Sequence, residues 1–301
     1  MPRYWPLWLG LGLVRALLVL PFAAQMAAGR GLGRLAHVFA RRDRRIADVN
    51  LRLCFPEMEA GQRRDLIRRH FESLGCALIE TALVWWAEDD ELLPLMRIEG
   101  EENLAAALAE GRGAILLSAH FTTLEMGARA MTMSTPTAIM YQEPKNALVG
   151  ELSRRARAHR AKRAIASDSV RELLQSLKQN LAAWYAPDQR ADRNGAIVPF
   201  FGIPATTNVA TSRLARISGA PVLPYFPERL PGGAGYVMRI GKRLEDFPSD
   251  DPLVDAARFH SLIEAHVRRC PDQYLWTYKR FKRPGPDGDP YSAQAAAAQG
   301  S

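Results

Sequence analysis

The chain has 301 residues, three cysteines and a formal net charge of +8. This length suits one large domain, and the few, unclustered cysteines argue against a disulfide framework or a zinc site and indicate a reducing compartment. The positive charge predicts acidic partners, and because no nucleic-acid-binding motif is recognisable, a membrane surface is favoured over nucleic acid.

The N-terminal segment is the most apolar part of the chain. Residues 4–29 contain only Arg15 and Gln25 as strongly polar interruptions, and Trp5 and Trp8 lie near one end. About 20 apolar residues span a bilayer, and aromatic residues commonly mark its interfaces. We therefore expect residues 1–29 to form a retained membrane anchor, either spanning the bilayer or lying in its interface. A signal peptide is a less consistent interpretation, because it begins with a positively charged region and this segment has a single basic residue there.

Basic residues follow this segment, which by the positive-inside rule places the rest of the chain in the cytoplasm. They are Arg30, Arg34, Arg41, Arg42, Arg44 and Arg45.

Downstream of the anchor, helices and strands are expected to alternate. The predicted helices cover residues 59–90, 103–110, 124–133, 147–159, 170–179, 210–218 and 256–269. The predicted strands cover residues 114–118, 137–141, 181–185, 221–226 and 236–240. Such alternation predicts an α/β sandwich with a mixed sheet, which we place at residues 30–283. Residues 284–301 are rich in Pro, Gly and Ala and are predicted to be a mobile tail.

One stretch carries a recognisable chemical pattern. An apolar strand is expected to end at His120, and Glu125 follows in the first turn of a helix that Thr122 or Thr123 would cap. The helix dipole favours an ionised Glu125, which could orient His120 and stabilise its imidazolium form, so that the histidine could take a proton from an alcohol. The spacing alone favours the simpler interpretation, in which the histidine only ends a strand and the glutamate is a solvated helix residue.

Longer segments change that balance. The chain resembles the late acyltransferases of lipid A biosynthesis, most closely the lauroyl and palmitoleoyl branch. The resemblance runs in order from residue 2 to about residue 283 and rests on residues 2–5, 50–58, 71–75, 120–129, 184–188, 198–202, 273–276 and 280–282.

This resemblance implies a fold of the glycerolipid-acyltransferase type and a place at the bacterial inner membrane, with the catalytic domain on the cytoplasmic side. It implies acyl transfer from acyl carrier protein to a hydroxyl on a hydroxyacyl chain of Kdo2-lipid IVA, without metal or cofactor. The expected partners are acyl carrier protein, the lipid A precursor and membrane lipids. Because a thioester is already activated, the reaction needs a base and oxyanion stabilisation rather than an enzyme nucleophile. His120 is the expected base and Glu125 its orienting partner.

Three further residues are predicted substrate contacts. Gln142 stands where the family usually has an arginine, and Lys145 could supply the missing charge. Asp188 matches the family's Pro-Asp element and would order the cleft, although a turn aspartate is the simpler reading. Arg213 would contact a phosphate or pair internally. The Gln142 departure keeps open a different glycolipid or amino-acid lipid as acceptor, and a non-catalytic membrane scaffold is the alternative of another class.

A basic cluster lies in the middle of the chain and has two readings. It is either a solvated helix face or a docking surface for the acidic carrier protein or substrate phosphates. Its members are Arg154, Arg155, Arg157, His159, Arg160, Lys162 and Arg163.

Overall fold

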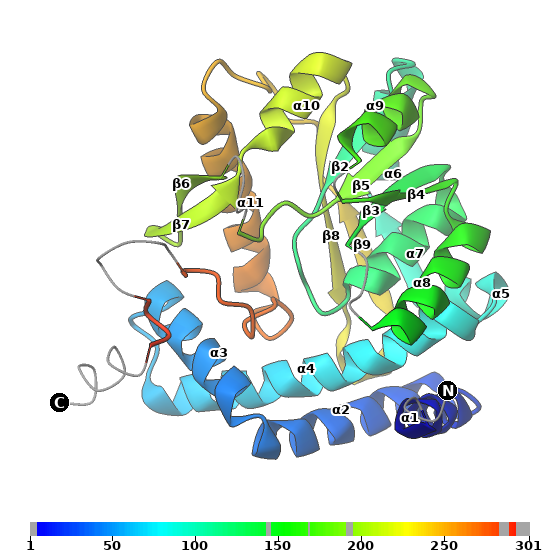
Figure 1. Cartoon of the computed structure of the whole chain (residues 1–301), viewed down its shortest axis with the longest axis vertical. Coiled ribbons are helices and arrows are strands. Elements are labelled where there is room, and N and C mark those ends of the chain that lie inside the picture. The colour runs from blue at the N-terminus through cyan, green and yellow to red at the C-terminus, as the bar shows by residue number, and fades with distance from the viewer. Residues whose placement is uncertain (1–4, 143–145, 168, 191–194, 283–288, 293–301) are drawn as a thin grey trace.

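The computed structural model describes residues 5–142, 146–167, 169–190, 195–282 and 289–292, and a seven-stranded sheet forms its centre (Figure 1). The strand order is β1-β9-β8-β2-β5-β3-β4. All neighbours pair in parallel except β8 and β9, so the predicted mixed α/β sheet is confirmed. The strands are β1 (Met96–Glu99), β2 (Ala114–Leu117), β3 (Thr137–Tyr141), β4 (Arg163–Ala166), β5 (Ala182–Tyr185), β8 (Val222–Arg229) and β9 (Tyr236–Ile240). A separate hairpin joins β6 (Gly195–Phe200) to β7 (Ile203–Asn208).

Helices cover both faces of the sheet. In β2, Ala114 and Leu116 face the apolar cluster of α6 and α7, whereas Ile115 and Leu117 face the cluster of α9, α10 and α11. A central parallel strand with both faces buried reads as an unbroken apolar run, which is why residues 114–117 lack alternation. The helices after β1 are α6 (Glu101–Ala109), α7 (Leu124–Ser134), α8 (Ala147–Arg160), α9 (Val170–Lys178), α10 (Ala210–Ser218), the short η3 (Pro231–Gly233) and α11 (Pro252–Arg269).

The N-terminal helices cross one end of this sandwich (Figure 1). They are α1 (Trp5–Leu17), α2 (Phe22–Phe39), α3 (Arg41–Cys54), α4 (Ala60–Trp86), α5 (Asp89–Leu92) and the short η2 (Leu93–Leu95). Helices α2 and α4 pack side by side at very short separation. A Cβ atom on Gly33 of α2 would lie only 2.1 Å from the carbonyl oxygen of Phe71 on α4. A glycine at the crossing allows this close approach. The close packing in turn fixes α2 against the folded body.

The expected N-terminal membrane helix is not supported. Helix α1 has 13 residues, and at about 1.5 Å per residue it is shorter than the roughly 30 Å hydrocarbon core. The chain turns at residues 18–20, and α2 begins directly after Pro21. Because proline disfavours a helix that continues through it, α1 and α2 are two separate helices. Among the residues that the structure describes, no helix combines the length and the apolar character needed to cross a membrane. The boundary expected at residue 29 lies within α2.

Some elements escaped prediction. The edge strands β1 and β4 have only four residues each. In the β6–β7 hairpin, Pro199 and Pro204 lie opposite each other, and proline normally argues against a strand. Within the expected tail, residues 289–292 pack against the body, because buried Tyr291 donates a hydrogen bond to Asn50 on α3 and accepts one from the Phe281 amide.

Candidate active site

His120 lies just beyond the C-terminal end of β2 and is paired with Asp188. The imidazole Nδ1 lies 2.5 Å from one carboxylate oxygen of Asp188, and the His120 amide donates to the other at 3.1 Å. Strand β5, which precedes Asp188, is the parallel neighbour of β2. Because the carboxyl ends of parallel strands meet at one sheet edge, two residues far apart in sequence come into contact there.

The carboxylate of Asp188 is held firmly in the interior. Its side chain is only 2% exposed, compared with 26% for His120. Tyr274 donates a further hydrogen bond to it at 3.2 Å. With the carboxylate accepting from Nδ1–H, the neutral imidazole carries its lone pair on Nε2, the form that a general base requires.

Burial and pairing act in opposite directions on both groups. Burial lowers the pKa of His120, but the charge of Asp188 and the hydrogen bond between them outweigh it, so the pKa lies above its ordinary value of 6.5. Burial raises the pKa of Asp188, yet the charge and hydrogen bonds of His120, together with the charge of Arg280, hold that pKa below its ordinary value. The pair therefore favours an ionised Asp188 and an imidazole that readily accepts a proton.

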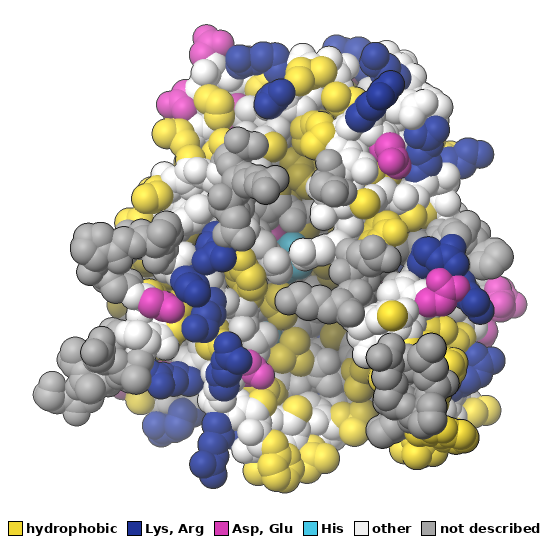
Figure 2. Space-filling model, viewed as in Figure 1, with side chains coloured by type: hydrophobic (Ala, Val, Ile, Leu, Met, Phe, Trp, Pro, Cys, Tyr) yellow, Lys and Arg dark blue, Asp and Glu magenta, His cyan; other side chains and the backbone are white. Residues whose placement is uncertain are grey.

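A cleft of about 380 Å³ opens beside His120. Figure 2 shows a hollow near the centre of this face, with a histidine side chain visible inside it. Side chains from β3, β5, β7 and α7 and from the loops after β2, β3, β4 and β5 surround it. The lining residues are His120, Leu124, Glu125, Ala128, Ile139, Met140, Tyr141, Gln142, Ser167, Trp184, Tyr185, Ala186, Pro187, Gln189, Arg190 and Asn208. Cavities of this size commonly hold small molecules.

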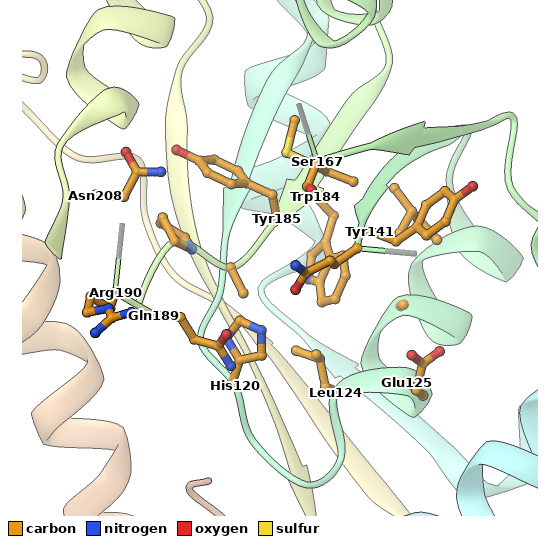
Figure 3. A pocket seen from close by; sticks show the side chains of 16 residues that line it. His120, Leu124, Glu125, Tyr141, Ser167, Trp184, Tyr185, Gln189, Arg190 and Asn208 are labelled. Atoms are coloured by element: carbon orange, nitrogen blue, oxygen red, sulfur yellow. The ribbon is translucent and has the colours of Figure 1, made fainter. Parts of the chain in front are cut away.

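Glu125 lines the same cleft from the first turn of α7. Figure 3 shows Leu124 between its carboxylate and the imidazole of His120. Nδ1 of His120 donates its hydrogen bond to Asp188 instead. The partner that orients His120 is therefore one that spacing along the chain could not identify, and a catalytic role of Glu125 stays a prediction.

The other predicted contacts are placed differently. Gln142 lines the cleft, whereas Arg213 is exposed on α10 and is not among the residues that line it. Lys145 lies outside the described residues. In the basic cluster, Arg154 and Arg155 both pair with Glu151 on the same helix, and Arg163 lies on β4 beyond the helix.

The segment after His120 is anchored from behind by residues that the sequence did not single out. Of the two predicted caps, Thr123 occupies the N-cap position of α7, but its hydroxyl donates to the Pro227 carbonyl and does not accept from a helix amide. The hydroxyls of Thr122 and Ser73 are 2.8 Å apart, and the Thr122 amide donates to the Gln273 carbonyl. Arginine 229, paired with Glu80, also donates to the Ser73 hydroxyl. These bonds fix the loop that carries the histidine.

The whole sequence fits one known family. Residues 1–283 match the family described as bacterial lipid A biosynthesis acyltransferase. The chain belongs to this family. It is 35% identical to the lipid A biosynthesis lauroyltransferase of Escherichia coli K12, over 96% of this chain and 95% of that protein. It is 36% identical to the palmitoleoyltransferase of the same organism, over 93% and 92%. Identity to the myristoyltransferase of that organism is 26%, over 94% and 90%.

The geometry of this family member thus brings together a histidine paired with a buried carboxylate and a cleft with apolar walls. Side chains such as Leu124, Ile139 and Trp184 form the apolar part of the lining.

Proposed function

We propose that the protein transfers a fatty acyl chain, lauroyl-like in length, from acyl carrier protein to a hydroxyl on a hydroxyacyl chain of Kdo2-lipid IVA. The observation that carries this proposal is the His120–Asp188 pair at a cleft with apolar walls. The family supports the acyl transfer to lipid A, and the names of the lauroyl and palmitoleoyl relatives support the substrate class.

The chemistry follows from the pair. Nε2 of His120 takes the proton of the acceptor hydroxyl as the oxygen attacks the thioester carbonyl. The tetrahedral intermediate then collapses, so the carbon–oxygen ester bond stays and the carbon–sulfur bond breaks. The thiolate of the carrier leaves and takes the proton back from the imidazolium. Asp188 stabilises the charged imidazole throughout, and no metal or cofactor takes part in these steps.

Several polar residues are proposed to bind substrate. Glu125 lines the cleft and would place a second carboxylate near the acceptor hydroxyl. Lys145 and Arg213 are retained as proposed substrate contacts, with the acceptor phosphates as their natural partners. A second candidate acceptor, a different glycolipid or amino-acid lipid, is favoured by Gln142, because this neutral side chain lines the cleft where the family usually has an arginine.

The protein is proposed to act at the cytoplasmic surface of the inner membrane. Large apolar side chains are exposed along α1 and α2, which run beneath the sandwich. They are Trp5, Trp8, Leu9 and Leu13 on α1, and Leu32, Leu35, Val38 and Phe39 on α2. Arginines that follow, including Arg41, Arg42 and Arg45, would contact anionic head groups. Such a surface would keep the cleft close to a lipid acceptor.

Incubating purified protein with acyl carrier protein thioesters and Kdo2-lipid IVA tests the proposal. Mass analysis of the lipid should show the gain of one acyl chain, and acyl-coenzyme A in place of the carrier tests the donor. Acylation of another glycolipid with none of Kdo2-lipid IVA would establish the second candidate. No transfer to any lipid from a folded protein would refute both.

A further inference from the structure

The cleft has two chemically different sides. Figure 3 shows His120 between Gln189, Arg190 and Asn208 on one side and Leu124, Glu125 and Tyr141 on the other. The second side continues into apolar lining formed by Leu124, Ala128, Ile139 and Trp184, which we term the apolar branch. The apolar lining therefore lies across His120 from Gln189, Arg190 and Asn208.

The apolar branch is built from regular structure. Ile139 of β3 and Trp184 of β5 are direct neighbours in the sheet, and both belong to the buried cluster on its α7 face. Leu124 and Ala128 are one helical turn apart on α7, so their side chains project from the same face of the helix. The branch thus has a floor of two sheet side chains and a wall of two helix side chains, all fixed by rigid elements.

The inner part of the branch is closed by the hydrophobic core. Ile139 is 4% exposed, Trp184 5% and Ala128 7%. Met131, which lies one helical turn beyond Gly127 on α7, is completely buried in the same cluster. Ala128 is the smallest lining side chain in the branch, so a larger residue at this position would extend into the cleft.

We infer that the apolar branch receives the distal end of the donor acyl chain, and that Ala128 and Ile139 set the chain length that it accepts. This inference rests on the proposed acyl transfer and adds the place and the residues of selectivity. Burying one more methylene of the acyl chain in an apolar site strengthens binding about fourfold. A wall displaced by the length of two methylenes therefore changes the preference between two donors that differ by two carbons by about 15-fold.

The two residues give opposite predictions. Ala128→Leu adds three carbon atoms to the wall and should favour a donor two carbons shorter, lowering the ratio of long-chain to short-chain transfer by about tenfold. Ile139→Ala removes three carbon atoms from the floor and should raise the same ratio. Ile165→Ala is the matched control, because Ile165 is fully buried on the adjacent strand β4 and does not line the cleft.

The experiment is a competition. Carrier-protein thioesters of an even-numbered saturated series are mixed at equal concentration with Kdo2-lipid IVA, and mass spectrometry gives the distribution of chains transferred by each variant. Opposite shifts for Ala128→Leu and Ile139→Ala, with none for Ile165→Ala, support the inference. If Ala128→Leu does not fold, the smaller Ala128→Val takes its place.

The possible outcomes distinguish failure of this inference from failure of the proposed function on which it rests. Normal transfer with an unchanged chain distribution in both variants would overturn the inference and leave the proposed function intact. Failure of the unaltered protein to acylate any lipid would refute the proposed function instead. Equal shifts in the Ile165→Ala control would assign the effect to general loosening of the core and would also overturn the inference.

Discussion

Replacing Asp188 by asparagine tests whether its carboxylate orients the base. One oxygen accepts from Nδ1 of His120, and the other accepts from the His120 amide and the Tyr274 hydroxyl. The amide oxygen of asparagine can keep the latter two donors, which turns its NH2 group toward Nδ1. That group donates, so the imidazole proton moves to Nε2, and the nitrogen facing the acceptor hydroxyl can no longer take a proton.

The size of the effect follows from the role proposed for the base. Loss of a correctly oriented general base typically costs about 10²- to 10⁴-fold, or about 3 to 5 kcal/mol in activation free energy. We therefore expect kcat of Asp188→Asn to fall in that range, with KM for the donor little changed. Asp255→Asn is the matched control, because Asp255 is equally buried but accepts from the Ser249 amide, outside the lining of the cleft.

The pH dependence of acyl transfer should also change in Asp188→Asn. The pKa of His120 is raised above 6.5, so activity of the unaltered protein should be lost as the pH falls through a midpoint above that value. Without the charge of Asp188, burial dominates, and the residual activity should show a midpoint below 6.5. The assay is transfer of radiolabelled acyl chain across a pH series. Near-normal kcat with an unmoved midpoint in folded Asp188→Asn would refute the assignment.

Three further predictions concern other parts of the molecule. Glu125→Ala should lower kcat at least tenfold if its carboxylate acts in the cleft, while Glu125→Gln keeps the shape and should show the same loss; full activity of both variants would remove Glu125 from the mechanism. Replacing both Leu9 and Leu13 by aspartate should reduce cosedimentation with lipid vesicles without lowering the melting temperature, since both side chains are exposed; undiminished binding would move the membrane contact elsewhere. Charge reversal at Arg154 and Arg155 should raise KM for the carrier-protein thioester and weaken its salt dependence, whereas an unchanged KM would show that the carrier binds another surface.

Much of the fold could be predicted because local pattern and burial agree. Helix α10 and strands β3 and β9 begin and end where predicted. The elements that were missed carry conflicting signals, such as opposed prolines in the β6–β7 hairpin and charged neighbours around β4. The N-terminal apolar segment has the composition of a membrane helix, but the turn before Pro21 divides it, and composition alone does not register that break.

The site was predictable only in part. The position of His120 at the cleft could be predicted, because a histidine shortly after a buried strand lies at the sheet edge where functional groups gather, and its role as the base stays a prediction. Its partner could not, because contact between His120 and Asp188 depends on β2 and β5 being sheet neighbours, which a separation of 68 positions does not reveal. The family resemblance predicts Asp188 only as a residue that orders the cleft, without linking it to His120. Knowledge of the strand order would have brought the two residues together.

The central claim is that His120 is the general base of acyl transfer. The direct measurement is the rate of labelled acyl transfer from carrier-protein thioester to Kdo2-lipid IVA by His120→Ala, at saturating donor. His37→Ala on α2 serves as the histidine control, and circular dichroism and vesicle binding confirm that both variants fold. Our account predicts a fall of at least about 100-fold for His120→Ala and little change for the control. Near-normal transfer by folded His120→Ala would contradict it.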